Sequence, residues 1–156
     1  MNRKDWLDRW VAGNIGWHQE TGNENLRRFW PRLVKGHRVL VPFCGKSVDI
    51  IWLAGQGYDV TGVELSAVAT ETFFDEQQLS YELDASGRLA CYRACEHSIA
   101  LYCGDYMDFV APRFDALFDR ASLIALDRSS RPSYVRHTKT LLKADATQLL
   151  ITLEYD

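Results

Sequence analysis

Two features of the sequence are suited to binding a polar ligand: the turn Cys44-Gly45-Lys46-Ser47 and the carboxylate of Glu64. The turn follows an apolar run at residues 39–41, and apolar residues at helical spacing come after it, so we expect a helix to begin there. The first backbone amides of a helix carry the positive end of its dipole and favour an anionic or polar group. A second apolar run, residues 60–63, ends on Glu64. A carboxylate at that place in a Rossmann-like fold accepts hydrogen bonds from both hydroxyls of a ribose.

The glycine content of the turn distinguishes two kinds of nucleotide. A pyrophosphate approaches the backbone closely only where the turn has the pattern G-x-G-x-x-G. This turn has Gly45 alone. The sequence therefore favours a nucleoside without a pyrophosphate over NAD, and a nucleotide-dependent oxidoreductase is the alternative.

The elements that must position these groups follow from the hydrophobic pattern. Helical spacing predicts helices over residues 4–11, 23–30 and 66–79, and a last helix that begins near Pro132. The spacing of the second continues to Leu33, with Pro31 disturbing its end. Turn residues within 80–97 predict a hairpin. Apolar runs predict five further strands, over residues 39–41, 60–63, 99–103, 114–118 and 149–153. This order predicts an α/β fold with a mostly parallel sheet flanked by helices.

Candidate ligand-contacting residues lie at the carboxyl ends of four predicted strands. They are Gly45, Glu64, Asp105 and the pair Asp119-Arg120. In an open parallel sheet, ligands bind in the crevice outside these ends. We therefore expect the four positions to converge on one place.

The amino-terminal segment is rich in tryptophan. Trp6 and Trp10 lie four residues apart on one predicted helix, and Trp17 and His18 follow in a loop. The indoles either close one edge of the core or cover a ligand. His18 is either a general base or a hydrogen-bonding structural residue, which is the commoner role of a lone loop histidine.

Composition sets wider limits. The chain has 156 residues, of which 47% are hydrophobic and 25% charged, and this suits a single domain with its own core. A formal charge of -3 gives no basic surface for nucleic acid or membranes. The first residues lack the apolar region of a signal peptide, and no apolar run reaches the length of a membrane span. We expect a cytoplasmic protein.

The cysteines are Cys44, Cys91, Cys95 and Cys103. They include no C-x-x-C pair and no histidine spacing typical of zinc, so we expect reduced thiols and no metal. Cys44 lies in the ligand-facing turn, where a helix amino terminus can lower its pKa. The simpler interpretation is a small residue that fits a tight turn.

Several motifs together resemble the thiopurine S-methyltransferase family over essentially the whole chain. They are Trp6-x3-Trp10, Ile15-Gly16-Trp17-His18-Gln19, Val41-Pro42-Phe43-Cys44-Gly45-Lys46-Ser47-Val48-Asp49, Gly62-Val63-Glu64, Asp119-Arg120-Ala121 and Leu153-Glu154-Tyr155. The resemblance implies the Rossmann-like fold of S-adenosylmethionine-dependent methyltransferases, with an amino-terminal helical cover at about residues 1–35 and a sheet core at about 37–156. It implies S-adenosyl-L-methionine as cofactor. Its contacts would be Trp6, Trp10 and Trp17 in the cover, Phe43 and Gly45 in the turn, Glu64 at the ribose, and Asp105 and Tyr106 near the adenine.

The resemblance also implies a reaction at the sulfur of small aromatic or heterocyclic thiols, with Arg120 facing the acceptor. Methyl transfer from a sulfonium is an in-line displacement that needs alignment and exclusion of water more than acid-base groups. Arg120 suits an electrostatic partner of a thiolate, and Asp119 either orients Arg120 or accepts a proton. Indole faces near a sulfonium add cation-π stabilisation of roughly 0.5 to 2 kcal/mol. Detoxification of selenium or tellurium species is an extension that the family suggests.

Members of the family continue past the Glu-Tyr-Asp segment with further strands, which this sequence does not contain. We therefore expect a complete cofactor half and an incomplete substrate half. A non-catalytic module that binds S-adenosylmethionine stays open as an alternative. The expected partner is a small-molecule thiol, and the expected state is a monomer.

Overall fold

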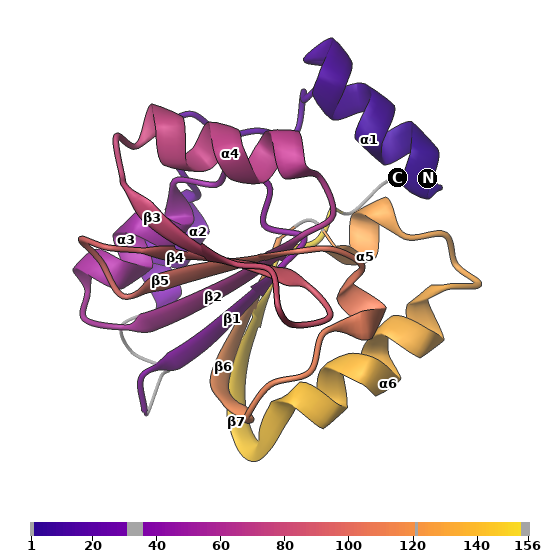
Figure 1. Cartoon of the computed structure of the whole chain (residues 1–156). Helices are drawn as coiled ribbons and strands as arrows, with labels where there is room; N and C mark the ends of the chain where they lie inside the picture. The colour runs from indigo at the N-terminus through magenta and orange to yellow at the C-terminus, as the bar shows by residue number, and fades with distance from the viewer. Residues whose placement is uncertain (1, 31–35, 121, 154–156) are drawn as a thin grey trace.

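The fold is a twisted sheet with helices on both faces, seen in a computed structural model that describes residues 2–30, 36–120 and 122–153 (Figure 1). The sheet has the strand order β3-β4-β5-β2-β1-β6-β7. Strands β5, β2, β1, β6 and β7 run parallel, and β3 and β4 form an antiparallel hairpin at one edge. The mostly parallel sheet and the hairpin are thus confirmed. The strands are β1 (Arg38–Pro42), β2 (Asp59–Glu64), β3 (Tyr81–Asp84), β4 (Ala90–Ala94), β5 (Ile99–Cys103), β6 (Phe114–Asp119) and β7 (Leu142–Leu150).

The helices divide between the two faces of the sheet. In Figure 1, α4 lies above the sheet as drawn and α6 lies below it. Helices α2, α3 and α4 contribute to one core cluster, and α5 and α6 pack in the cluster on the other face. The helices are α1 (Arg3–Ala12), α2 (Glu24–Phe29), α3 (Asp49–Gly55), α4 (Ala67–Glu76), α5 (Ser122–Ala125) and α6 (Arg131–Leu141), with a 3-10 turn η2 (Tyr106–Asp108) after β5. None of these helices is long and apolar enough to cross a membrane.

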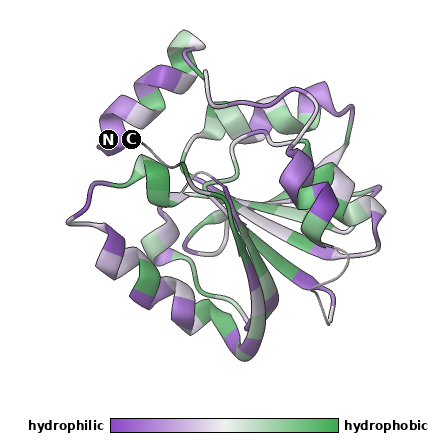
Figure 2. Cartoon of the chain, turned by 180° about the vertical axis from the view of Figure 1, so that it is seen from behind, coloured by the Kyte–Doolittle hydropathy of each residue, from purple (hydrophilic) through white to green (hydrophobic). Residues whose placement is uncertain are grey.

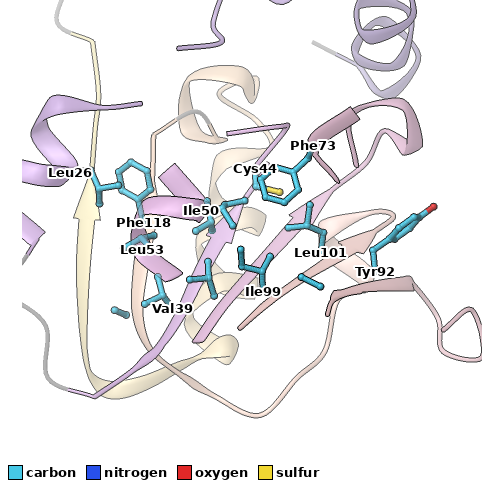
Figure 3. Packing of buried hydrophobic residues seen from close by; sticks show 14 of the residues in the cluster. Leu26, Val39, Cys44, Ile50, Leu53, Phe73, Tyr92, Ile99, Leu101 and Phe118 are labelled. Carbon is cyan, nitrogen blue, oxygen red and sulfur yellow. The ribbon is translucent and has the colours of Figure 1, made fainter. Parts of the chain in front are cut away.

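Alternation along the strands sends side chains into two cores. Val39 and Val41 of β1 join the larger cluster, under α2, α3 and α4, whereas Leu40 joins the cluster on the side of α6. Figure 3 shows the larger cluster, where Phe73 of α4 and Ile50 of α3 pack against β-strand residues such as Leu101. Both faces are covered, so the central strands are apolar on both sides.

Helix α6 is amphipathic, as the spacing of its apolar residues indicates. Hydrophobic and hydrophilic residues alternate along it in Figure 2, and its buried residues are Tyr134, Thr138 and Leu141. The prediction of a last helix beginning near Pro132 is confirmed, since this proline occupies the first turn, where its missing N–H costs nothing.

The last strand begins earlier than predicted. The expected range was 149–153, but β7 starts at Leu142, directly after α6, and ends at Leu150. Residues 143–148 are largely polar and β7 is an edge strand, which does not need an apolar pattern on its solvent side. A register shift opposite residues 114–116 of β6 accommodates the extra length.

Two other predicted helices have shifted ends. Ser66, the first residue of the range predicted as 66–79, caps α4, since its hydroxyl accepts from the backbone N–H of Ala69 at 3.2 Å. The helix ends before residue 79 because Gln78 adopts a left-handed φ of 54°, and the N–H of Leu79 returns to the carbonyl of Phe74 at 2.9 Å. The helix predicted over 23–30 is α2; the expected roles of Pro31 and Leu33 lie outside the described residues.

Candidate functional site

A cavity of about 400 Å³ opens at the carboxyl ends of β1, β2 and β5. Five of the predicted cofactor residues line it: Trp6, Phe43, Glu64, Asp105 and Tyr106. The side of α5 and α6 completes the wall with Ala125, Leu126, Ser129, Ser130, Ser133 and Tyr134. Of the four positions predicted to converge, Glu64 and Asp105 line the cavity and Gly45 bonds to Glu64, whereas Asp119 and Arg120 are not among its lining residues.

Glu64 is the central polar group of this cavity. Its side chain is 1% exposed, and its Oε2 accepts from the N–H of Gly45 at 2.9 Å. Its Oε1 accepts from the N–H of Ser66 and from the indole Nε1 of Trp6, each at 2.9 Å. Burial raises the pKa of Glu64, and the three donors act against that rise by favouring the carboxylate. The turn amide and the cover indole therefore both hold this carboxylate in place.

The three tryptophans form one cluster at the amino-terminal edge. Trp6 and Trp17 stack at a centroid distance of 4.7 Å, and Trp10 meets Trp17 edge-on at 5.9 Å. Trp6 and Trp10 pack on Ala69 of α4. Of the three, Trp6 lines the cavity, whereas Trp10 and Trp17 do not border it but contact the ring of Trp6. The cluster thus combines the two interpretations of the sequence, packing and ligand cover.

Gly45 allows this cover to approach the turn. Its φ is 54°, and a Cβ built there would lie 3.0 Å from Cζ2 of Trp10. Any larger residue would press on a buried indole in a backbone conformation that favours glycine. Phe43 adopts a similar φ of 50° two residues earlier, and its ring borders the cavity. A strained non-glycine residue of this kind is typical of functional sites.

An aromatic wall forms the side of the cavity next to α6. The rings of Phe43, Tyr106 and Tyr134 have centroids 5.3 to 5.8 Å apart. The Tyr106 hydroxyl bonds to Oγ1 of Thr138 at 2.9 Å, and the Tyr134 hydroxyl donates to Asp119. Burial raises the pKa of both tyrosines above the usual value, so their hydroxyls stay protonated at neutral pH.

Asp119 and Arg120 diverge from the end of β6. The Asp119 carboxylate accepts from Tyr134 and from the N–H of Ser122, and it is 1% exposed. The Arg120 Nη1 instead donates to the carbonyl of Trp17 at 2.8 Å. Consecutive residues at a strand end point to opposite faces of a sheet. The expectation that Asp119 orients Arg120 is therefore wrong, because the two side chains bind different partners.

The remaining residues of the turn act within the scaffold. The Lys46 ammonium pairs with Glu76 of α4 at 2.6 Å, and Asp49 accepts from the N–H of Asn23 at 2.8 Å. Cys44 is buried, and burial raises the pKa of its thiol well above the usual value. The idea that the helix terminus activates Cys44 is wrong, and the packing interpretation is confirmed by its contact with Gly62, where a Cβ would lie 2.6 Å from Sγ.

His18 lies in the cover rather than in the cavity wall. Its side chain is 7% exposed, and Nε2 is 3.6 Å from Oε1 of Glu20. Its backbone N–H bonds to the carbonyl of Ile15 at 2.9 Å. These contacts fit the structural interpretation of this histidine.

The wall contributed by α5 and α6 was not anticipated as part of the site. Tyr134 lies on the buried face of α6, and helical periodicity alone cannot show that this face borders a cavity. The right-handed crossover from β6 to β7 was an available signal, because it places the connecting helix on one predictable face of the sheet. The four-residue helix α5 is too short to show any period.

Comparison with known proteins supports the resemblance seen in the motifs. A profile of the thiopurine S-methyltransferase family matches residues 1–156. The chain is 44% identical over 161 residues to a thiopurine S-methyltransferase of Pseudomonas syringae pv. pisi, covering 100% of this chain and 73% of that protein. It is 43% identical over 163 residues to a probable thiopurine S-methyltransferase of Yarrowia lipolytica, covering 100% of this chain and 75% of the relative.

Solved structures establish the same fold class. A 1,6-didemethyltoxoflavin-N1-methyltransferase of Burkholderia thailandensis, with its substrate and S-adenosylhomocysteine bound, superposes with a TM-score of 0.72 at 18% identity, covering 99% of this chain and 62% of that one. The glycopeptide N-methyltransferase MtfA with S-adenosyl-L-methionine superposes with a TM-score of 0.63 at 23% identity, covering 83% of this chain and 49% of that one. This chain thus spans about half to three fifths of the length of these structures, and they show the fold alone. Because the family profile matches this chain along the whole length of the chain, the chain belongs to the thiopurine S-methyltransferase family.

Proposed function

We propose that the chain is an S-adenosylmethionine-dependent methyltransferase that acts on the sulfur of small aromatic or heterocyclic thiols. The observation that carries this proposal is the buried carboxylate of Glu64 in a cavity at the carboxyl ends of the parallel strands. That position suits the ribose of a nucleoside. Family membership supports the choice of cofactor and of sulfur as the acceptor atom.

The residues of the cavity suit a nucleoside. Glu64 would accept from the ribose hydroxyls, with its Oε1 exchanging the indole N–H of Trp6 for a hydroxyl. Asp105 and the ring of Tyr106 lie beyond β5, on the side where the resemblance places the adenine. Lys46 is paired with Glu76 and does not line the cavity, so this lysine cannot serve a pyrophosphate there. When bound, S-adenosylmethionine supplies a methyl group carried on a sulfonium.

Arg120 would interact with the thiol that accepts the methyl group, and not with the cofactor. Burial lowers its pKa from the usual value, but a guanidinium stays charged in proteins. It is fixed by the carbonyl of Trp17, at the end of β6 and beneath the cover. A fixed cation there would attract a thiolate and hold the nucleophile without taking part in proton transfer.

A transfer assay tests this proposal. The purified chain is incubated with methyl-labelled S-adenosylmethionine and 6-mercaptopurine, with hypoxanthine as the matched acceptor that has oxygen in place of sulfur. We expect label on the thiopurine and none on hypoxanthine. Binding of S-adenosylhomocysteine without transfer to any thiol would favour the non-catalytic binding module, and binding of NADH in its place would favour an oxidoreductase.

Three finer points belong to the same proposal. Reduced selenium and tellurium species are soft nucleophiles like thiolates and are a second acceptor class for this assay. We also propose a cytoplasmic location and a monomeric state. Sedimentation at several concentrations measures the second of these directly.

A further inference from the structure

The pair Asp119 and Tyr134 joins the end of β6 to the cavity. The Tyr134 hydroxyl donates to Oδ2 of Asp119, and Oδ1 of Asp119 accepts from the N–H of Ser122 at 3.0 Å. The Ser122 hydroxyl in turn donates to the carbonyl of Pro42 at 3.2 Å, next to Phe43. Asp119 is 1% exposed and Tyr134 is 4% exposed, and of the two only Tyr134 lines the cavity.

We propose that Asp119 and Tyr134 form a positioning pair, in which the carboxylate fixes the tyrosine ring as the wall against which the purine of the cofactor lies. This inference rests on the proposed function and extends it. It assigns Asp119 to the binding of the cofactor, through Tyr134, and not to the chemistry of the methyl group.

The ring geometry suits a flat aromatic ligand. Phe43 meets Tyr106 at 76° and Tyr134 at 77°, and the two tyrosines are inclined at 33° to each other. The rings come from three separate elements: the turn after β1, η2 and α6. Since both hydroxyls are bonded to other side chains, it is ring surface that the wall contributes. Offset and edge-on aromatic contacts are favourable beyond the area that they bury.

The position of Glu64 decides which ligand group the wall contacts. Glu64 and the aromatic wall border the same cavity. A purine is joined to its ribose by one glycosidic bond, so a ribose held at Glu64 leaves the purine within this cavity. Arg120, the cation suited to a thiolate, binds the carbonyl of Trp17 and does not line the cavity. The volume of about 400 Å³ is near the small end for ligand pockets, which span roughly 300 to 1,000 Å³.

The hydrogen bond gives Asp119 its influence over the ring. Burial raises the pKa of Asp119, and the bonds from Tyr134 and Ser122 favour its carboxylate form. Loss of the phenol would leave one oxygen of a buried carboxylate without its donor, and loss of the carboxylate would free the ring to turn. The two residues should therefore act as one unit toward a ligand.

The test is a double-mutant cycle on the dissociation constant of S-adenosylhomocysteine, measured by calorimetry at 10 °C on folded protein. The variants are Tyr134→Phe, Asp119→Asn and their combination. Tyr92→Phe is the matched control, because Tyr92 is also buried but belongs to the core on the other face of the sheet. We expect each single change to weaken binding about three- to tenfold, the double variant to match the single ones, and the control to bind like the wild type.

Each outcome decides a different point. A wild-type chain that fails to bind S-adenosylhomocysteine overturns the proposed function, and this inference with it. Normal binding in both single variants overturns the inference alone, as do effects that add in the double variant. A lower kcat with an unchanged dissociation constant in Asp119→Asn would also overturn the inference, because it would show that Asp119 acts in the methyl transfer itself. If Asp119→Asn does not fold, Tyr134→Phe, which keeps the ring volume, still gives the decisive affinity.

Discussion

At the scale of single residues, the indole N–H of Trp6 donates to a carboxylate oxygen that a ribose hydroxyl would need as its acceptor. It bonds to Oε1 of Glu64, which also accepts from Ser66. Binding of a nucleoside therefore requires an exchange of donors at this oxygen. The cover is then part of the binding equilibrium and not only a wall of the site.

Replacing Trp6 with phenylalanine removes that donor and keeps a ring in the wall. We expect Trp6→Phe to bind S-adenosylhomocysteine as tightly as the wild type or up to about tenfold more tightly, because the competing hydrogen bond is gone. Trp6→Ala should bind more weakly, because it removes the wall itself. Calorimetry measures both. Equal weakening in the two variants would mean that the indole N–H itself binds the ligand.

Arg120 separates acceptor effects from cofactor effects. We expect Arg120→Ala to lower kcat/KM for 6-mercaptopurine by about tenfold to a hundredfold, a loss of roughly 1.4 to 2.8 kcal/mol. The S-adenosylhomocysteine affinity should change much less, because Arg120 does not line the cavity. Arg120→Lys keeps the charge but loses the planar fork, so it should recover part of the rate. A loss of cofactor affinity with normal acceptor kinetics would place Arg120 in the cofactor site.

At the scale of elements, the turn after β1 and helix α1 are fitted to each other. The positive φ of Gly45 and its approach to Trp10 leave little room for a Cβ. The turn thus sets the height of the cover above the sheet.

Gly45→Ala tests this fit. The left-handed conformation costs an alanine roughly 1 to 2 kcal/mol, and the new methyl group would displace the indole of Trp10. We expect a lower melting temperature and a red-shifted tryptophan emission as the cluster opens. Gly55→Ala is the control, because Gly55 lies in α3 with open space at its Cβ position. Similar behaviour of the two variants would show that the turn does not support the cover.

Much of this architecture was predictable because it depends on local patterns. Ser66, Pro132 and the apolar runs of the central strands marked their elements directly. The polar segment 143–148 was not predictable as a strand, because its pairing with β6 comes from tertiary contact at an edge. The site divides in the same way. Glu64 followed from its place at a strand end, whereas Tyr134 required knowledge of which helix face meets the cavity.

At the scale of the whole molecule, Asp115 joins three strands at the end of the sheet opposite the cavity. Its Oδ1 accepts from Lys143 of β7 at 2.6 Å, and its Oδ2 accepts from the backbone N–H groups of His37 and Arg38, at 3.1 and 2.9 Å. The hydrogen bond from Lys143 and these amides lower the pKa of Asp115 to about 2. Charge at one carboxylate therefore supports the edge strand and the start of β1 together.

The depressed pKa predicts an acid dependence of stability. An aspartate in an unfolded chain titrates near about 3.9. Because the folded value is lower, the stabilisation is fully present above pH 4 and is lost as the pH falls from about 4 to about 2. Asp115→Asn should therefore lower the urea midpoint at pH 7, and its difference from the wild type should shrink across this window. A difference that stays constant down to pH 2 would contradict the assignment.

The central claim is that Glu64 holds the ribose of S-adenosylmethionine in the cavity at the strand ends. Calorimetric titration of S-adenosylhomocysteine into the wild type and into Glu64→Ala tests it most directly, with NADH as the competing ligand. A carboxylate that accepts from ribose hydroxyls leaves them unpaired when it is removed, so we predict weaker binding by about 1 to 3 kcal/mol in a variant that stays folded, and no binding of NADH to either protein. Equal affinity of the folded variant and the wild type for S-adenosylhomocysteine would contradict the account.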